Sequence, residues 1–187
     1  MFLLARSLKD PDVMGHALFW YFKSELDIEP QNLRLRFMLE QFMLLHSAKS
    51  HGYFRQCDLV QSLLSLALLV KRSEPAKRNE VLREGLTHLH VPSGCILPVN
   101  PATRVGGVIA KKCKCLDSFT TPLWLVFENL DPEEEPVYII FKTGDDLRQD
   151  ALTIQMLQIM DNVSALDMTL PSLTAFSFGD RTEWICI

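Results

Sequence analysis

The stretch VYIIFKTGDDLRQDALTIQMLQIMD, residues 137–161, combines residue types and spacing that suit phosphate chemistry. An apolar strand pattern ends at Lys142, a Gly-Asp-Asp turn follows, and an amphipathic helix pattern with acidic residues comes next. An ammonium group at a strand end, beside a helix that carries acids, can neutralise the phosphate oxygens of a nucleotide. A strand-end lysine exposed to water is the alternative, and these residues alone leave both interpretations open.

The start of this helix also has an ordinary structural explanation. Asp146 can cap the helix, and Gln149 at the third helical position can reach back to the backbone. Asp145 and Asp146 could instead be metal ligands, but capping explains them more simply. We predict the helix from about Asp146 to Val163, with an apolar stripe facing inward.

The first ninety residues are predicted to be helical. Apolar residues at helical spacing predict helices at residues 12–26, 33–46, 59–72 and 76–89. Asp10 followed by Pro11 marks a helix start. The first of these helices has an apolar side made of Val13, Ala17, Trp20, Phe22 and Leu26. Successive helices joined by short turns suggest a helical stack.

The pattern changes at Val91. VPSGCILPVNP has the composition of a linker, with three prolines and a glycine. Strand-like runs follow at residues 106–116, 122–129 and 137–142, and further short strands surround a Gly-Asp turn near residue 180. We therefore predict an α+β fold of two domains: an α-solenoid-like helical segment over residues 1–90, and antiparallel strands with one main helix over residues 91–187.

Composition argues against several classes of protein. The formal net charge of -4 argues against nucleic-acid binding, and we expect no nucleic-acid partner. No apolar run reaches the roughly 18 residues that a membrane-spanning helix needs. The N-terminal apolar stretch has no basic segment before it, so it makes a poor signal peptide. Five irregularly spaced cysteines favour reduced thiols and a cytosolic protein.

Two other clusters have a functional and an ordinary interpretation. Cys113 and Cys115, with two nearby histidines and Cys95, could suggest zinc, but no second pair has metal-site spacing, so thiols without a metal are favoured. Lys111, Lys112 and Lys114 could face an anionic membrane, or they could solvate a strand edge.

The segment IIFKTGDDLRQDALTIQMLQIMD closely resembles the IIFK-x-GDDLRQDMLTLQ segment of phosphoinositide 3-kinase catalytic subunits, class I most closely and class II next. FLLARSLKDPDVMGHALFWYFKSEL, LPVNP, KKCKCLDS, PLWLVFEN and SFGDRTEWICI follow family motifs in the same order. The resemblance implies that residues 1–90 are the last helices of the helical domain with linker helices. It implies that residues 91–187 are a protein-kinase-like N-lobe that ends at the hinge.

The resemblance also implies roles for individual residues, with ATP as the cofactor. Lys142 would contact the ATP phosphates, and Asp150 would be the acid near it on the helix. The loop Leu116–Pro122 would bind phosphate through Ser118. Trp124 and Ile140 would line the adenine pocket. Mg²⁺ ligands and the catalytic loop are expected beyond the hinge, so no catalytic residue and no metal ligand is predicted among these residues.

Three positions depart from the family pattern. Thr120 and Thr121 stand where the phosphate loop normally has a basic residue, Ser172 replaces a pocket tyrosine, and Cys186 stands where the hinge has an acid. A missing cation beside a triphosphate should weaken nucleotide binding. With the catalytic loops absent from this sequence, we expect the 187-residue chain alone to be inactive.

The resemblance therefore predicts part of a lipid kinase that transfers the ATP γ-phosphate to the 3-hydroxyl of a phosphoinositide. The expected partners are a phosphoinositide membrane surface and, in a complete protein, a regulatory subunit and a Ras-type GTPase. The expected location is the cytoplasm, with recruitment to the plasma membrane. The alternative is a truncated, inactive binding or scaffold protein derived from the same family.

Overall fold

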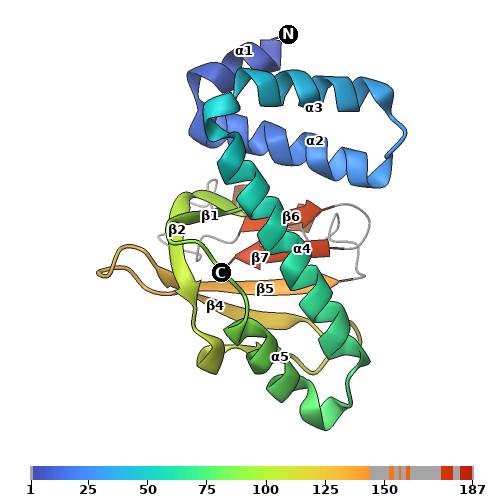
Figure 1. The fold of residues 1–187 in the computed structure, drawn as a ribbon, viewed down its shortest axis with the longest axis vertical. Coiled ribbons are helices and arrows are strands. Elements are labelled where there is room, and N and C mark those ends of the chain that lie inside the picture. Colours follow the sequence, from blue (N-terminus) through green and yellow to red (C-terminus); the bar gives the residue numbers. More distant parts are fainter. Residues whose placement is uncertain are drawn as a thin grey trace.

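A helical layer and an antiparallel sheet make up the fold, and a long helix runs across both (Figure 1). The computed structural model describes residues 2–143, 152–153, 156, 159–160, 174–178 and 182–186. The helices are α1 (Phe2–Lys9), α2 (His16–Ile28), α3 (Leu33–Leu45), α4 (Ser50–Arg72) and α5 (Arg78–Thr87). Short helical turns are η1 (Pro11–Gly15), η2 (Ser47–Lys49), η3 (Pro75–Lys77) and η4 (Ala110–Lys112). In Figure 1, α1 to α3 gather at one end, and α4 leads from them over the sheet toward α5.

The described strands pair in the order β1-β2-β4-β5-β7-β6, and β3 pairs with β4. Every pairing is antiparallel. The strands are β1 (Cys95–Leu97), β2 (Asn100–Val108), β3 (Lys114–Cys115), β4 (Leu123–Asn129), β5 (Val137–Thr143), β6 (Thr174–Phe178) and β7 (Thr182–Cys186). β4 and β5 lie where the strand patterns predicted them, and β6 and β7 flank the predicted Gly-Asp turn.

Two sequence predictions in this region are wrong. The segment predicted as a linker contains β1 and the start of β2, with Leu97 and Asn100 paired across a tight turn. Proline is compatible with this hairpin because Pro98 lies in the turn, where its fixed φ is tolerated. Residues 106–116, predicted as one strand, are divided into β2 and β3 by η4.

The helix predicted from Asp146 to Val163 lies largely outside the described residues. The described positions within it, residues 152, 153, 156, 159 and 160, are helical. Their helical conformation agrees with the prediction. Met160, however, belongs to the apolar stripe predicted to face inward and is 61% exposed, so that part of the prediction is wrong at this position.

The chain enters α2 through a π-helical turn, η1, that the sequence pattern did not predict. Pro11 takes the first helical position, and the Asp10 carboxylate accepts a hydrogen bond from the Val13 amide at 3.2 Å. The Gly15 amide then donates to the carbonyl of Asp10, five residues back. A turn of this width adds a residue and shifts the helical phase of everything after it.

Part of the predicted apolar stripe lies at the surface. Trp20 and Phe22 are buried as predicted, but Val13 and Ala17 are exposed. Phe19 is buried instead, and its ring stacks on Tyr53 of α4 with the centroids 4.4 Å apart. The prediction placed Val13 wrongly because Val13 lies inside the π-helical turn and not in a regular α-helix. It placed Ala17 wrongly because Ala17 lies on nearly the opposite side of the regular helix α2 from Phe19 and Phe22.

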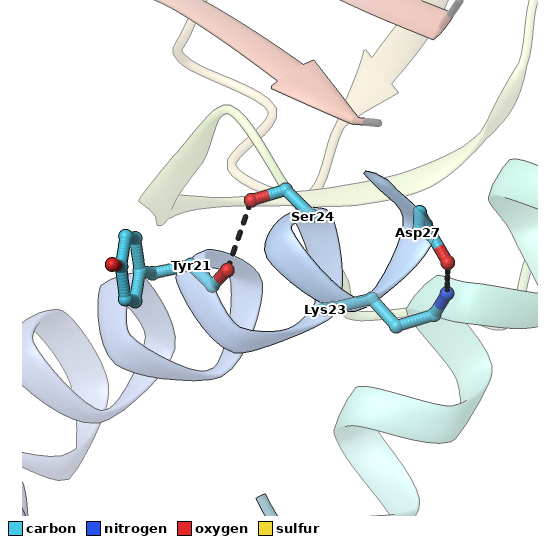
Figure 2. A network of polar contacts seen from close by, with 4 residues as sticks. All are labelled: Tyr21, Lys23, Ser24 and Asp27. Carbon is cyan, nitrogen blue, oxygen red and sulfur yellow. Dashed lines mark hydrogen bonds and ion pairs between the residues drawn. The ribbon is translucent and has the colours of Figure 1, made fainter. Parts of the chain in front are cut away.

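The C-terminal half of α2 carries polar contacts at the surface. Figure 2 shows Lys23 and Asp27 one turn apart as an ion pair, and the Ser24 hydroxyl donating to the Tyr21 carbonyl at 2.9 Å. Exposed pairs at this spacing stabilise a helix by only about 0.3–0.5 kcal/mol. The orientation of α2 is therefore set by its buried aromatic side.

Buried polar side chains pair with one another inside the helical layer. Gln56 Oε1 accepts hydrogen bonds from Trp20 Nε1 at 2.8 Å and from His16 Nε2 at 3.1 Å. Because an amide oxygen can only accept, His16 carries its proton on Nε2 here. Ser7 Oγ lies 2.9 Å from His46 Nε2. These pairs satisfy polar groups whose burial would otherwise be costly.

The helix α4 is longer than predicted, because it begins at Ser50 and not near Leu59. Its first turns look polar in sequence, but Tyr53 and Gln56 are buried in the helical layer. Further along, Leu63 and Val70 are fully buried, and α4 packs on β1 and β5. One helix thus supplies core residues to both layers.

The α+β fold predicted from the sequence is confirmed, with a helical segment followed by antiparallel strands. Buried apolar side chains of the helices and of the sheet form a common core. The division into domains at residue 90 stays a prediction. Among the helices within the described residues, none combines the length and apolarity needed to cross a bilayer.

Replacing Leu63 with alanine should destabilise the chain by about 3 kcal/mol, because it leaves a cavity under α4. The matched control is Leu69→Ala in the same helix, where the side chain is 55% exposed and the expected cost is below about 0.5 kcal/mol. Urea unfolding followed by circular dichroism measures both. Equal losses in the two variants would contradict the packing described for α4.

Acidification should destabilise the chain through His16 and His46. Burial lowers the pKa of both imidazoles below the ordinary value of 6.5, and the charge of Lys49 lowers that of His46 further. Between the folded-state pKa and 6.5, the unfolded chain therefore binds more protons than the folded chain. The free energy of unfolding is then highest above pH 6.5 and falls as the pH decreases through this range. The urea midpoint should drop between pH 7.5 and pH 5.5.

The variant His16→Gln should reduce this drop, whereas His88→Gln, which changes an exposed histidine, should leave it as it is. If the urea midpoint drops equally in both variants, the protonation of His16 does not cause the loss of stability.

Candidate functional site

The register of β4 and β5 places three predicted site positions on one face of the sheet. Trp124 pairs with Ile140, and Lys142 lies two residues further along β5, on the same side. Side chains of β5 alternate between fully buried and half-exposed, and Ile140 and Lys142 are on the half-exposed side. The fully buried set includes Ile139 and Phe141, on the face against which α4 packs. Trp124, Ile140 and Lys142 therefore share the face turned away from α4.

Trp124 is the centre of a small cluster on this face. Its ring lies 5.7 Å from that of Tyr138, tilted by 39°. Lys114 of β3 pairs in register with Trp124, and its Nζ stands 6.0 Å from the Trp124 ring centroid, at the limit of a cation–π contact. The face thus offers an apolar surface with a lysine at each side, Lys114 and Lys142.

Sequence reasoning did not single out Lys114 for this face. The signal was present, because lysine and cysteine alternate in KKCKC, and such alternation indicates a strand with one polar side. The structure agrees with that alternation: Cys113 is buried and Lys114 is exposed.

The loop Leu116–Pro122 joins β3 to β4 at the Lys142 end of the sheet, since Leu123 at the start of β4 pairs with Phe141. The Leu116 amide donates to the Pro122 carbonyl at 2.8 Å and closes the loop. Ser118 is exposed, and its carbonyl accepts from the amide three residues on. The hydroxyl of Ser118 is therefore accessible at the end of the sheet where Lys142 lies.

Thr121 has an unusual conformation in this loop. Its φ is 54°, in the left-handed region that β-branched residues rarely adopt, and its side chain is buried. Such strain persists only where the surroundings impose it. A long basic side chain at this position would have to leave the buried site that threonine fills. Phe119, two residues earlier, is almost completely exposed.

The predicted partner of Lys142, Asp150, lies outside the described residues, so their pairing stays a prediction. Ser172 lies outside them too. On the other side of β5, the register places Glu183 of β7 opposite Lys142. Sequence reasoning missed this acidic position. The strand pattern around the Gly-Asp turn could have suggested a hairpin, but not its register on β5.

Cys113 supports the sheet beside this site. The chain leaves the β4 ladder at η4, and the Val126 amide donates to Cys113 Sγ at 3.3 Å where a strand carbonyl would otherwise stand. Within the described part of the chain, Cys57, Cys95, Cys113 and Cys115 are free thiols, and no three potential ligands gather into a metal site. Burial raises the pKa of each of these four thiols.

Comparison with known proteins gives consistent results over nearly the whole chain. The chain is 37% identical over 182 residues to phosphatidylinositol 3-kinase 2 of Dictyostelium discoideum, which covers 95% of this chain and 10% of that protein. It is 36% identical over 186 residues to the human phosphatidylinositol 4-phosphate 3-kinase C2 domain-containing subunit beta, covering 95% of this chain and 11% of that protein. Phosphatidylinositol 3-kinase 1 of Dictyostelium discoideum is 34% identical over 187 residues, covering 98% and 12%.

The chain thus spans about a tenth of the length of these curated relatives. No protein-family model matches it.

Alkylation of Cys57 should be slow at neutral pH and should accelerate as the pH rises. Burial raises the pKa of this thiol from 9.0 to about 11. At pH 8 the reactive thiolate is then about a hundredfold scarcer than in a thiol with the ordinary pKa. Iodoacetamide labelling followed by peptide mass spectrometry, at pH 7 to 10, measures the rate.

The same chain unfolded in urea is the control, in which Cys57 should react about a hundredfold faster at pH 8. Native and unfolded rates that agree would show that the thiol is not shielded as the structure describes.

Proposed function

Since this chain is homologous over nearly its whole length to a segment of phosphatidylinositol 3-kinases, we propose that it forms the nucleotide-binding side of such a lipid kinase. In this proposal the enzyme transfers the ATP γ-phosphate to the 3-hydroxyl of a phosphoinositide, and ATP is bound with Mg²⁺. The names of the relatives describe 3-kinases of phosphatidylinositol and of phosphatidylinositol 4-phosphate.

The observation that carries the proposal is the shared face of Trp124, Ile140 and Lys142, with the loop Leu116–Pro122 at its Lys142 end. An adenine ring needs an apolar, flat surface, and Trp124 and Ile140 provide one on adjacent strands. A triphosphate needs cations and hydrogen-bond donors at one end of that surface, and Lys142 and the hydroxyl of Ser118 are there.

Phosphoryl transfer needs little covalent chemistry from the protein, because catalysis depends on positioning and on neutralising charge. Lys142 would offset the negative charge of the phosphates and fix their distance from the sheet. Trp124 and Ile140 would exclude water from one side of the base. Asp150 is proposed to orient the Lys142 ammonium from the helix that follows. Mg²⁺, when bound with ATP, would supply further positive charge beside the phosphates, and no residue of this chain is assigned to hold it.

We propose a cytoplasmic protein recruited to the plasma membrane, where phosphoinositides are available. The exposed Lys111 and Lys112 on η4 could contribute to attraction by anionic lipid, at about 1 kcal/mol for each lysine near the surface. A regulatory subunit and a Ras-type GTPase are further proposed partners. These proposals rest on the family and not on the described contacts.

The alternative function is a binding or scaffold protein of this family without turnover. One observation favours it. Thr120 and Thr121 stand where the family's phosphate loop normally has a basic residue, and Thr121 is buried with a left-handed backbone. A loop with fewer cations should hold a triphosphate less tightly. Nucleotide binding therefore decides between the two functions.

Replacing Lys142 with methionine should weaken ATP binding by at least about tenfold, because a charge-assisted contact to phosphate is lost while the length of the side chain is kept. Fluorescence anisotropy of a labelled ATP analogue with Mg²⁺ measures binding to the chain. In the complete gene product expressed in cells, the same variant should reduce lipid 3-phosphorylation by at least about a hundredfold.

The control is Lys71→Met, which removes an exposed lysine from the last turn of α4, away from the face that carries Trp124. It should leave both measurements unchanged. ATP binding that is equal in the wild type and in Lys142→Met would exclude the assigned role of Lys142. A wild-type chain that binds no ATP would favour the scaffold function.

A further inference from the structure

A cavity lies where the helical layer meets the sheet, away from the face that carries Lys142. Its volume is about 240 Å³, and its walls come from η1, η2, the first turns of α4, β1 and β2. The side chains that matter there are Asp12, His16, Lys49, Tyr53, Gln56 and Arg104. The cavity is large enough for more than a single water molecule, and most of these groups are polar.

Tyr53 brings an unsatisfied hydroxyl to this cavity. The residue is only 4% exposed, and its ring is held in place by stacking on Phe19. The hydroxyl has no hydrogen-bond partner, although buried polar groups in folded proteins almost always have one. Burial raises the pKa of this phenol to about 12, so at neutral pH it keeps its proton and can donate. A buried donor without an acceptor, at the wall of a cavity, indicates a place for a ligand that accepts.

The fixed neighbours of Tyr53 do not provide that acceptor. The oxygen of Gln56 is already shared by Trp20 and His16. Burial lowers the pKa of His16, so this imidazole is neutral at pH 7. Gly15 has no side chain to crowd the phenol. A Cβ at this position would lie 3.3 Å from the Tyr53 hydroxyl oxygen. The inner wall of the cavity is therefore polar, uncharged and closely packed.

Positive charge dominates the mouth of the cavity. Lys49 forms an ion pair with Asp12, and Arg104 of β2 also acts on Asp12 and lowers its pKa together with Lys49. Two cations thus face one carboxylate, which leaves an excess of one positive charge. Lys49 is also the residue before the 23-residue helix α4, whose start has no side-chain cap. The positive end of this helix dipole adds to the same field.

We propose that this cavity binds a phosphate group, carried by a small soluble phosphate ester or by a lipid headgroup. Lys49 and Arg104 supply charge-assisted hydrogen bonds to the phosphate oxygens, and the Tyr53 hydroxyl donates to the innermost oxygen. Asp12 gives up part of its contact with Lys49 when the anion is bound, which sets a moderate affinity. The site joins η1 and α4 of the helical layer to β2 of the sheet, so an occupied site would hold the two layers together.

The experiment uses the purified chain and inorganic phosphate as the first probe, titrated by calorimetry at constant ionic strength against chloride. Wild-type chain should bind phosphate, and Lys49→Met and Tyr53→Phe should each weaken binding by about tenfold. Tyr53→Phe keeps the stacking on Phe19 and removes only the unsatisfied hydroxyl. Without phosphate this variant should be at least as stable as the wild type, because a buried group without a partner has been removed.

Two control variants separate this site from other sources of binding. Lys71→Met removes a lysine from the opposite end of the same helix, and Lys142→Met removes the lysine of the proposed nucleotide site. Both should retain phosphate binding at this cavity. Glycerol 3-phosphate and vesicles containing phosphatidic acid are the second and third probes. They distinguish a soluble ester from a lipid headgroup, and binding of either supports the proposal.

Absence of phosphate binding above the chloride control would overturn the proposal. Binding that persists equally in Lys49→Met and Tyr53→Phe would overturn it as well. Loss of binding in Lys142→Met alone would assign the phosphate to the sheet face and would also contradict phosphate binding in this cavity.

Discussion

The alternation of side chains along β5 is the constraint on which the arrangement of the candidate site depends. In a strand, neighbouring side chains point to opposite faces, so burial of Val137, Ile139 and Phe141 against the core turns Ile140 and Lys142 to the other face. The pairing of Trp124 with Ile140 then brings β4 into the same arrangement. A slip of one residue in this register would bury Lys142 in an apolar core, at a cost that the protein could not sustain.

The helical layer supports this sheet from behind by a continuous run of packing. At its start, α4 packs through Tyr53 on Phe19 and Phe42 of the helical layer, and further along it packs on the strands. α5 packs closely against α4, because Gly85 of α5 has no side chain where the two helices meet. A Cβ at that position would lie only 2.3 Å from Cδ1 of Leu66 in α4. The buried face of the sheet is thereby fixed, and the open face is left for a ligand.

Several features could be predicted from the sequence because they follow from periodicity. The strand with Lys142 at its end, the helices and the α+β class were of this kind, since alternation and helical spacing are local properties. The hairpin of β1 and β2 was missed because its prolines resembled a linker. The π-helical turn that ends at Gly15 was missed because no local pattern indicates an extra residue in a helix, and it changes the phase of Val13 relative to α2.

The candidate site was predictable to a similar extent. The resemblance supplied Lys142, Trp124, Ile140 and Ser118, and the strand register explains why the first three share a face. The left-handed backbone of Thr121 and the position of Glu183 opposite Lys142 could not be predicted, because both depend on contacts between segments distant in sequence. The cavity at Tyr53 is of the same kind, since its walls come from both layers.

The length of α4 has a mechanical consequence. At 1.5 Å per residue its 23 residues form a rod of about 35 Å, anchored at one end in the helical layer and lying against the sheet at the other. A tilt of about 3° at the anchored end would displace the far end by about 2 Å, which is comparable to the shifts that rearrange packed interfaces. A small rotation of the helical layer would therefore correspond to a larger displacement behind the strands that carry Trp124 and Lys142.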